Sequence, residues 1–350
     1  MLDNLVGNNA IKEAFRRMLS NQRVPNALIF AGEAGVGKRL FALELAKAVL
    51  CRNPQSGEAC DRCASCIRVV KFPKFPPHDS DHKDEYQKIF WSDHTDVGTV
   101  LPYKNNILVD AIRDLVEQAN FNPYEGAARF FLIDDADKLN ASNDSAANAL
   151  LKTLEEPPAT SHLILLTARP NSLLPTIRSR CQIVRFAPLL PEEIETHLLA
   201  DSKFSPNDVK LVSRLAGGSL GRALSFDLET YKQQREMMLG ALDALAVSKD
   251  RARLLKIAEE LNEVKLKDEY EARLEVLQTL IHDVWTLRLG AVENLVNFDL
   301  QSKLVRFAEA TESNRAQTWL QEIENLRETF IVNVNRKIAT DALFMKMANA

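Results

Sequence analysis

Short apolar runs alternate with amphipathic stretches over residues 1–187 of the chain. Three runs are apolar on both faces, as buried strands are, and they lie at residues 26–32, 129–133 and 162–167. An amphipathic helix is predicted to begin at Lys38, and a second is predicted over 145–156, where two prolines end it. Strands and helices in this order predict an α/β domain built on a parallel sheet.

The pattern becomes entirely helical after residue 187. Pro191 and Pro206 each open a helix at its first position, and Ser219 caps a short third helix. From about residue 229 the periodicity is that of helices packed in a bundle, with Trp285 and Trp319 assigned to the same core. The clearest apolar stripe consists of Tyr270, Leu274, Leu277, Ile281 and Val284. We therefore expect three domains, at residues 1–187, 188–228 and 229–350.

Residues 71–108 interrupt the alternation of strands and helices. This segment is rich in proline, aspartate and lysine, and it contains the run Phe72-Pro73-Lys74-Phe75-Pro76-Pro77. Proline-rich, charged sequence of this length favours a loop rather than a core element. We expect a long, partly irregular excursion on the surface of the first domain.

Composition and charge narrow the function classes. The 350 residues are 46% hydrophobic and 26% charged, as in a globular protein, and the formal net charge is −4. Such a chain has no overall attraction for DNA or anionic lipid, so any contact with nucleic acid is expected to depend on a local patch or on an assembled complex. No signal sequence or membrane span is evident, and we expect a cytoplasmic protein without a membrane partner.

Four of the five cysteines are clustered. They follow the spacing Cys-x8-Cys-x2-Cys-x2-Cys, which in a reducing compartment indicates a metal site rather than disulfides. Four thiolates give closed tetrahedral coordination, which suits structural Zn²⁺ and leaves no position for catalysis. Reduced surface thiols or an iron–sulfur cluster are the alternatives. The predicted zinc ligands of this module (residues 51–66) are Cys51, Cys60, Cys63 and Cys66.

A glycine-rich loop joins the first strand to the first helix. Gly32, Gly35, Gly37 and Lys38 have the strand–loop–helix context that a phosphate-binding loop requires. The alternative is a glycine-rich turn with a solvated lysine. The next residue is Arg39, where Ser or Thr usually coordinates Mg²⁺, and arginine has no acceptor atom. We therefore predict that ATP and Mg²⁺ bind weakly at most.

The second predicted strand ends in two carboxylates, as a Walker B motif does. Asp134 is expected beside Mg²⁺, and Asp135 stands where a carboxylate polarises the attacking water. That residue is usually glutamate, and aspartate is one methylene shorter, which predicts slow or absent hydrolysis. The alternative is a pair of solvated carboxylates at the end of a strand.

The order of these motifs resembles the clamp-loader subunits of bacterial DNA polymerase III, the gamma/tau and delta prime group of the AAA+ superfamily. The resemblance rests on the phosphate-binding loop, the four cysteines, the Walker B strand and two further runs, Leu-Leu-Lys-Thr-Leu-Glu-Glu-Pro-Pro at 150–158 and Ile-Arg-Ser-Arg-Cys at 177–181. It implies an AAA+ nucleotide-binding core, a small helical lid at 188–228 and an all-α collar at 229–350 through which subunits assemble.

The resemblance also implies roles for single residues. Thr167 matches sensor 1, which senses the γ-phosphate, and Arg222 in the lid matches sensor 2. Arg180 matches the arginine finger, which acts on ATP bound by a neighbouring subunit. Val6, between Leu5 and Gly7, matches the segment that packs on adenine. The alternative for Arg180 is an ordinary surface arginine near a helix, and the alternative for Arg222 is likewise an ordinary surface arginine.

Two members of the group compete for this sequence. The gamma/tau subunit hydrolyses ATP, whereas delta prime is a rigid partner whose own loop is often degraded. Arg39 and Asp135 favour delta prime, and so does the resemblance of residues 330–343 to its last collar helix. This implies gamma/tau and delta subunits as partners in a ring, together with the sliding clamp and primed DNA, and little or no ATPase activity of its own. A nucleotide kinase, a helicase and an AAA+ transcription regulator fit the later motifs less well.

Overall fold

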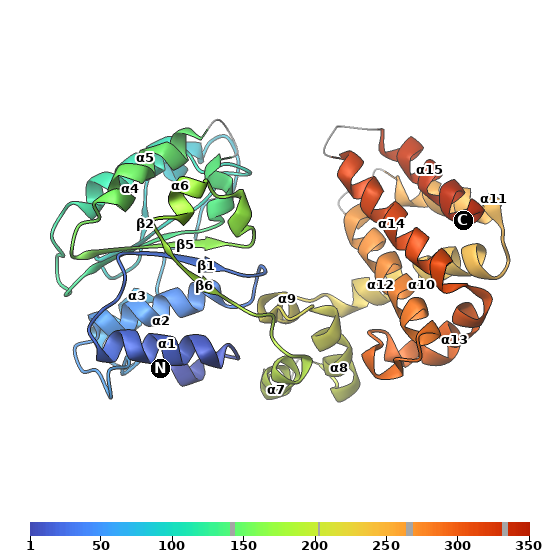
Figure 1. Ribbon diagram of the computed structural model, residues 1–350, viewed down its shortest axis with the longest axis horizontal. Helices are drawn as coiled ribbons and strands as arrows, with labels where there is room; N and C mark the ends of the chain where they lie inside the picture. The colour runs from blue at the N-terminus through green and yellow to red at the C-terminus, as the bar shows by residue number, and fades with distance from the viewer. Residues whose placement is uncertain (141–143, 202–203, 264–268, 331–334) are drawn as a thin grey trace. The chain divides into compact units, whose positions relative to one another are not determined.

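The computed structural model describes residues 1–140, 144–201, 204–263, 269–330 and 335–350. The chain forms two compact units (Figure 1): Met1–Lys203 with Ala216–Leu224, and Phe204–Leu215 with Ser225–Ala350. The division into three domains at 187/188 and 228/229 stays a prediction. No helix among the described residues is long and apolar enough to cross a membrane.

A six-stranded sheet forms the centre of the first unit, in the order β2-β3-β4-β5-β1-β6. All neighbouring strands are parallel except β2, which is antiparallel to β3. The three predicted strands are confirmed to within one residue, as β1, β4 and β5, and so is the α/β fold class. The strands are β1 (Ala27–Ala31), β2 (Phe90–Trp91), β3 (Val97–Val100), β4 (Arg129–Ile133), β5 (Ser161–Thr167) and β6 (Gln182–Arg185).

Helices cover both faces of this sheet, which is why its central strands are buried throughout (Figure 1). On one face α1 (Asn9–Ser20) and α2 (Lys38–Leu50) pack on β1, with Phe15, Phe30, Phe41 and Phe186 in ring contact. On the other face lie α4 (Val109–Ala119), α5 (Ser145–Glu155) and α6 (Pro175–Arg178). The predicted helix over 145–156 is therefore confirmed as α5.

The prediction for residues 71–108 is wrong in part. The segment contains β2 and β3, and all four residues of β3 are buried inside the sheet. Strand β3 was missed because Val-Gly-Thr-Val is too short to show a period, and its burial comes from β4 on one side and Ile89 and Trp91 on the other. The rest of the segment holds a chain of ring contacts that runs from Phe72 to Tyr103.

The remaining helices are divided between the two units. In the first unit, α3 (Ala64–Val69) begins directly after Cys63 and contains Cys66, and α7 (Pro191–Asp201) and α9 (Leu220–Leu224) contact each other. The second unit consists of α8 (Pro206–Leu215), α10 (Leu228–Ala246), α11 (Arg251–Leu261), α12 (Tyr270–Arg288), α13 (Gln301–Ala310), α14 (Ser313–Phe330) and α15 (Arg336–Asn349).

The core of the second unit follows the predicted stripe. All five of its residues are buried along α12, and Trp319 is fully buried, with its indole N–H donated to the carbonyl of Met347. Asn335 caps α15 by accepting the N–H of Ile338. Residues 331–334, part of the run compared above with a collar helix, lie outside the described residues.

Candidate nucleotide site and four-cysteine cluster

The loop between β1 and α2 has the backbone of a phosphate-binding loop. Gly35 and Gly37 have φ of +78° and +101°, a region that favours glycine, and α2 begins directly at Lys38. The Lys38 ammonium donates to the carbonyls of Gly32 at 2.6 Å and Glu33 at 2.8 Å. Burial lowers the pKa of Lys38, an effect that the charge of Asp135 opposes. The loop therefore holds its lysine over the turn that a phosphate would enter.

A cavity of about 380 Å³ opens beside this loop. Gly35, Gly37, Lys38, Asp134 and Asp135 line its polar end. Its other walls are apolar, and they include Val6, which the resemblance matched with the adenine-contacting segment. Among the apolar lining residues are Leu5, Val6, Leu166, Leu189, Leu220 and Leu224. The cavity thus joins a phosphate-type loop to an apolar pocket, as nucleotide sites do.

Arg39 stands directly after Lys38, at the position where Ser or Thr usually coordinates Mg²⁺. Its guanidinium forms an ion pair with Asp134 and donates through the same Nη1 to Thr99 Oγ1 at 3.2 Å. The rings of Phe72 and Phe75 lie 4.9 and 5.7 Å from the guanidinium carbon. Burial raises the pKa of the Asp134 carboxyl, and the charge of Arg39 opposes that rise. The carboxylate expected beside Mg²⁺ is therefore paired with a cation of the chain itself.

These residues do not fit Mg²⁺. The ion prefers oxygen ligands in octahedral geometry, but the position after Lys38 offers only guanidinium donors. Arg39 also puts a positive charge against the one Walker B carboxylate that would face the ion. Asp135 is turned away from this pair, since its side chain is 59% exposed and bonds to Lys138 at 3.0 Å. No catalytic step through Mg²⁺ follows from this arrangement.

Thr167 lies at the end of β5, where it is buried and bound by its own neighbours. Its hydroxyl donates to Asp137 at 3.0 Å and accepts the N–H of Arg169, whose guanidinium pairs with the same carboxylate at 2.7 Å. Hydrogen bonds to Arg169 and Thr167 lower the pKa of Asp137 in spite of its burial. Thr167 does not line the cavity, whereas its neighbour Leu166 does.

The short helix α9 packs directly on the phosphate-binding loop. The N–H of Gly221 donates to the Gly35 carbonyl at 3.0 Å, and a Cβ at Gly35 would lie 2.2 Å from the Ser219 hydroxyl. Glycine is therefore required at position 35 by this contact as well as by its φ. Arg222 lies on the exposed side of α9, one residue after the contact.

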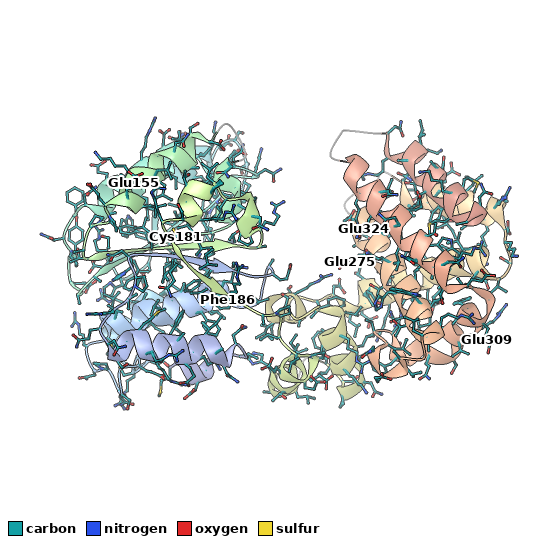
Figure 2. The ribbon with its side chains drawn as sticks, viewed as in Figure 1. Glu155, Cys181, Phe186, Glu275, Glu309 and Glu324 are labelled. Carbon is teal, nitrogen blue, oxygen red and sulfur yellow. The ribbon has the colours of Figure 1, made fainter. Side chains whose placement is uncertain are left out.

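Arg180 lies just after α6, outside the cavity of its own chain. Its guanidinium donates to Glu155 at 2.7 Å and to the Thr176 carbonyl at 2.9 Å, and the side chain is one-third exposed. Figure 2 labels Glu155 on α5 and Cys181 beside the sheet. Arg180 bonds to the first of these residues and directly precedes the second, which is buried, in the chain. The arrangement presents a cation at the surface of the unit.

The four clustered cysteines come together as the spacing predicts. Their sulfur atoms all lie within 4.8 Å of one another, and those of Cys51 and Cys63 are 4.0 Å apart. A tetrahedral zinc ion with bonds of about 2.3 Å requires sulfurs about 3.8 Å apart. Burial raises the pKa of Cys63, but hydrogen bonds led by the Cys66 N–H outweigh it and bring the value to about 6. The set fits one metal ion such as zinc.

The ends of two helices hold this cluster. Cys51 directly follows α2, and Cys63 caps α3 by accepting the N–H of Cys66. Ser65 donates to the Leu50 carbonyl at 2.7 Å and thereby ties the helices together. A metal bound here would connect α3 to the far end of the helix that begins at the phosphate-binding loop.

Comparison with known proteins decides the family. A family model described as DNA polymerase III, delta subunit, matches residues 7–190, and a second, for the C-terminal part of that subunit, matches residues 229–346. The delta prime subunit of Escherichia coli is 30% identical, and the alignment covers 92% of this chain and 88% of that protein. The chain belongs to the DNA polymerase III delta-subunit family.

Other relatives show how far the similarity extends along delta prime subunits and along tau subunits. The delta prime subunit of Bacillus subtilis is 26% identical over 91% of this chain and 89% of its own length. The tau subunit of Salmonella typhimurium is 30% identical over 82% of this chain, yet the chain spans only 44% of that protein. The resemblance to polymerase III clamp-loader subunits is therefore confirmed, with the Escherichia coli and Bacillus subtilis delta prime subunits matched along nearly their whole length.

Two groups of site residues escaped the sequence analysis. Asp137 and Arg169 surround Thr167, and Thr99, Phe72 and Phe75 surround Arg39. Asp137 stood in the Walker B run, so its carboxylate was a signal that went unused. The partners of Arg39 come from residues 71–108, and only the pairing of β3 with β4 brings them to the loop.

Proposed function

We propose that this family member is a delta prime-type subunit of the polymerase III clamp loader. In this proposal the chain supplies Arg180 to ATP bound by a neighbouring gamma/tau subunit and does not hydrolyse ATP itself. One observation carries it: Arg39 and Asp134 form an ion pair at the position where a motor subunit holds its metal. A metal position taken up by charges of the chain itself suits a partner of the motor rather than the motor.

The surroundings of Arg180 support a role outside its own chain. An arginine finger must reach a phosphoryl group with its fork of donors, and it stabilises the charge that develops there. Arg180 lies outside the cavity of its own chain and bonds to a carboxylate that is 51% exposed. A phosphate from a neighbour can replace so exposed a partner at little cost, because surface ion pairs contribute little.

The assembled partners follow from this role. We propose gamma/tau and delta subunits in one ring, which acts on a sliding clamp and reaches primed DNA only as a complex, since the chain has a net charge of −4. The lid at 188–228, the collar at 229–350, and the sensor roles of Thr167 and Arg222 belong to the same proposal. We also propose zinc as the metal of the four cysteines.

A motor subunit is the second candidate. The intact glycines, Lys38 and the likeness to tau favour it, because a motor needs a working phosphate-binding loop. The two candidates differ in which residue of this chain the activity of the complex requires.

The test is the ATPase activity of the reconstituted complex with clamp and primed DNA. Arg180→Ala is expected to lower the stimulated rate strongly, since arginine fingers are worth roughly 10³–10⁵ where they are essential. Lys38→Ala in the same chain is expected to have little effect. Arg113→Ala is the matched control, because Arg113 also pairs with one exposed carboxylate, Asp110, at 3.0 Å. A crippling Lys38→Ala with a silent Arg180→Ala would show that the chain is a motor.

A further inference from the structure

We infer that Arg39 takes the place of the divalent metal in this phosphate-binding loop, so that the cavity accepts a nucleoside polyphosphate without Mg²⁺. This inference goes beyond the proposed function, which requires only that the site does not turn over. It concerns the chain's own cavity and is independent of the role of Arg180 in a neighbouring site.

The first step is the position of the charge. In P-loop proteins the metal bridges the β- and γ-phosphate oxygens, held by the residue after the lysine and by the Walker B aspartate. In this chain those two positions are Arg39 and Asp134, and they bind each other. The guanidinium therefore lies where the metal would, and it carries the same sign of charge towards a phosphate.

The second step is that Arg39 is held in place but keeps hydrogen-bond donors that a phosphate can use. Thr99 and Asp134 both bind Nη1, and the rings of Phe72 and Phe75 lie near the guanidinium carbon. Among the residues that the structure describes, Nε and Nη2 have no hydrogen-bond partner. The side chain is 28% exposed and lines the cavity. Two donors of a planar fork are thus available to a phosphate, which arginine binds with paired hydrogen bonds.

The third step is the rest of the cavity. Lys38 and the backbone N–H groups of the glycine loop supply the usual phosphate donors. Val6, Leu189 and Leu224 supply an apolar wall for a base. At about 380 Å³ the space lies within the range of small-ligand sites, roughly 300–1,000 Å³. The phosphate donors and the apolar wall of an ATP site are therefore present, whereas the metal ligands are not.

The inference can be tested by calorimetric titration of the full chain with ATP and with ADP. One titration uses buffer freed of divalent ions on a chelating resin, and the other contains Mg²⁺. No soluble chelator is added, because it would compete for the metal of the four cysteines, and the metal content of the protein is measured before and after. We expect the two dissociation constants to agree within about twofold.

Variants sharpen the result. Arg39→Ser, which restores a hydroxyl after Lys38, is expected to make binding at least about tenfold weaker without Mg²⁺ than with it. Lys38→Ala is expected to abolish binding in both buffers, and Arg113→Ala to change neither.

Three results would overturn the inference: a wild-type affinity that rises about tenfold with Mg²⁺, no binding at about 1 mM nucleotide in either buffer, or Arg39→Ser behaving as wild type. If Arg39→Ser does not fold, the wild-type comparison decides alone. None of these results touches the ATPase assay of Arg180, so the two proposals can fail separately.

Discussion

Arg39 and Arg180 both lie beside a carboxylate in the first unit, but their surroundings differ. Arg39 meets a largely buried aspartate, a threonine hydroxyl and two aromatic rings, all from its own chain. Arg180 meets Glu155, which is half exposed, and one backbone carbonyl. The first arginine is fixed as part of the fold, whereas the second is free to exchange its partner.

This difference shows why a motif alone does not determine a role. Both residues lie in runs on which the resemblance to clamp-loader subunits rests, yet one pairs with the Walker B carboxylate of its own chain and the other is presented at the surface. The environment decides, because a pair that is buried and multiply bonded is expensive to break, while an exposed pair is worth about 0–1 kcal/mol. Three experiments test this comparison. Each is expected to change the part of the unit that contains Arg39 and the phosphate-binding loop, and to leave the surroundings of Arg180 unchanged.

The largest effect is expected from loss of the metal. The protein should contain one zinc per chain by elemental analysis, and Cys63→Ser should lose it. Zinc contributes about 10–16 kcal/mol of apparent binding energy in small peptides. Here, where a large core supports the unit, we expect a loss of about 3–5 kcal/mol in the free energy of unfolding. Hydrogen exchange should rise in α2 and α3 and stay unchanged in α5 and α6.

Cys181 provides the control for this experiment. It is the fifth cysteine, it lies next to Arg180, and burial raises its pKa to about 12, so it is an unreactive thiol outside the cluster. Cys181→Ala should therefore keep one zinc per chain. A wild-type protein without stoichiometric zinc, or a Cys63→Ser variant of unchanged stability, would contradict the prediction.

The sequence predicted the parts of this comparison that are local. Glycines, a lysine and a strand before them identify the loop, and four cysteines at close spacing identify the metal cluster, because both features use neighbouring residues. The α/β core was predictable for a related reason, since its strands are apolar on both faces. In each case the residues that determine the feature lie within about sixteen positions of one another.

The parts that were not predicted depend on contacts distant in sequence. Arg39 finds Thr99 only because β3 pairs with β4, the strand that ends just before Asp134, and nothing near Arg39 in the sequence indicates the Thr99 hydroxyl as a partner. Strand β3 itself is four residues long, so its burial is a property of the assembled sheet. Arg180 could be placed by resemblance, but its exposed bond to Glu155 comes from the packing of α6 near α5.

A smaller effect is expected from removing Arg39. Arg39→Ala leaves the Asp134 carboxylate largely buried without its cation, which should lower the free energy of unfolding by about 2 kcal/mol. The double variant Arg39→Ala/Asp134→Asn should recover most of that loss, because no charge is then left unpaired. Urea unfolding of the four proteins of this double-mutant cycle measures both. Additive losses in the double variant would mean that the pair is not coupled.

The smallest effect is the pH dependence of that loss. The pKa of Asp134 is raised above its ordinary value by burial, so the folded protein binds this proton more tightly than the unfolded chain does. The contribution of Asp134 to the free energy of unfolding therefore falls as the pH rises above the pKa of the unfolded chain, about 3.8.

Without Arg39 the pKa of Asp134 rises further, and the penalty for ionising this carboxyl grows. The difference in stability between wild type and Arg39→Ala should then be larger at about pH 7 than at about pH 5, by less than about 1 kcal/mol. Arg180→Ala should show no such dependence, because the Glu155 side chain is half exposed to solvent. Urea unfolding at the two pH values measures the difference, and a loss that is greater at the lower pH would contradict the assignment of Arg39 as the partner of a buried carboxylate.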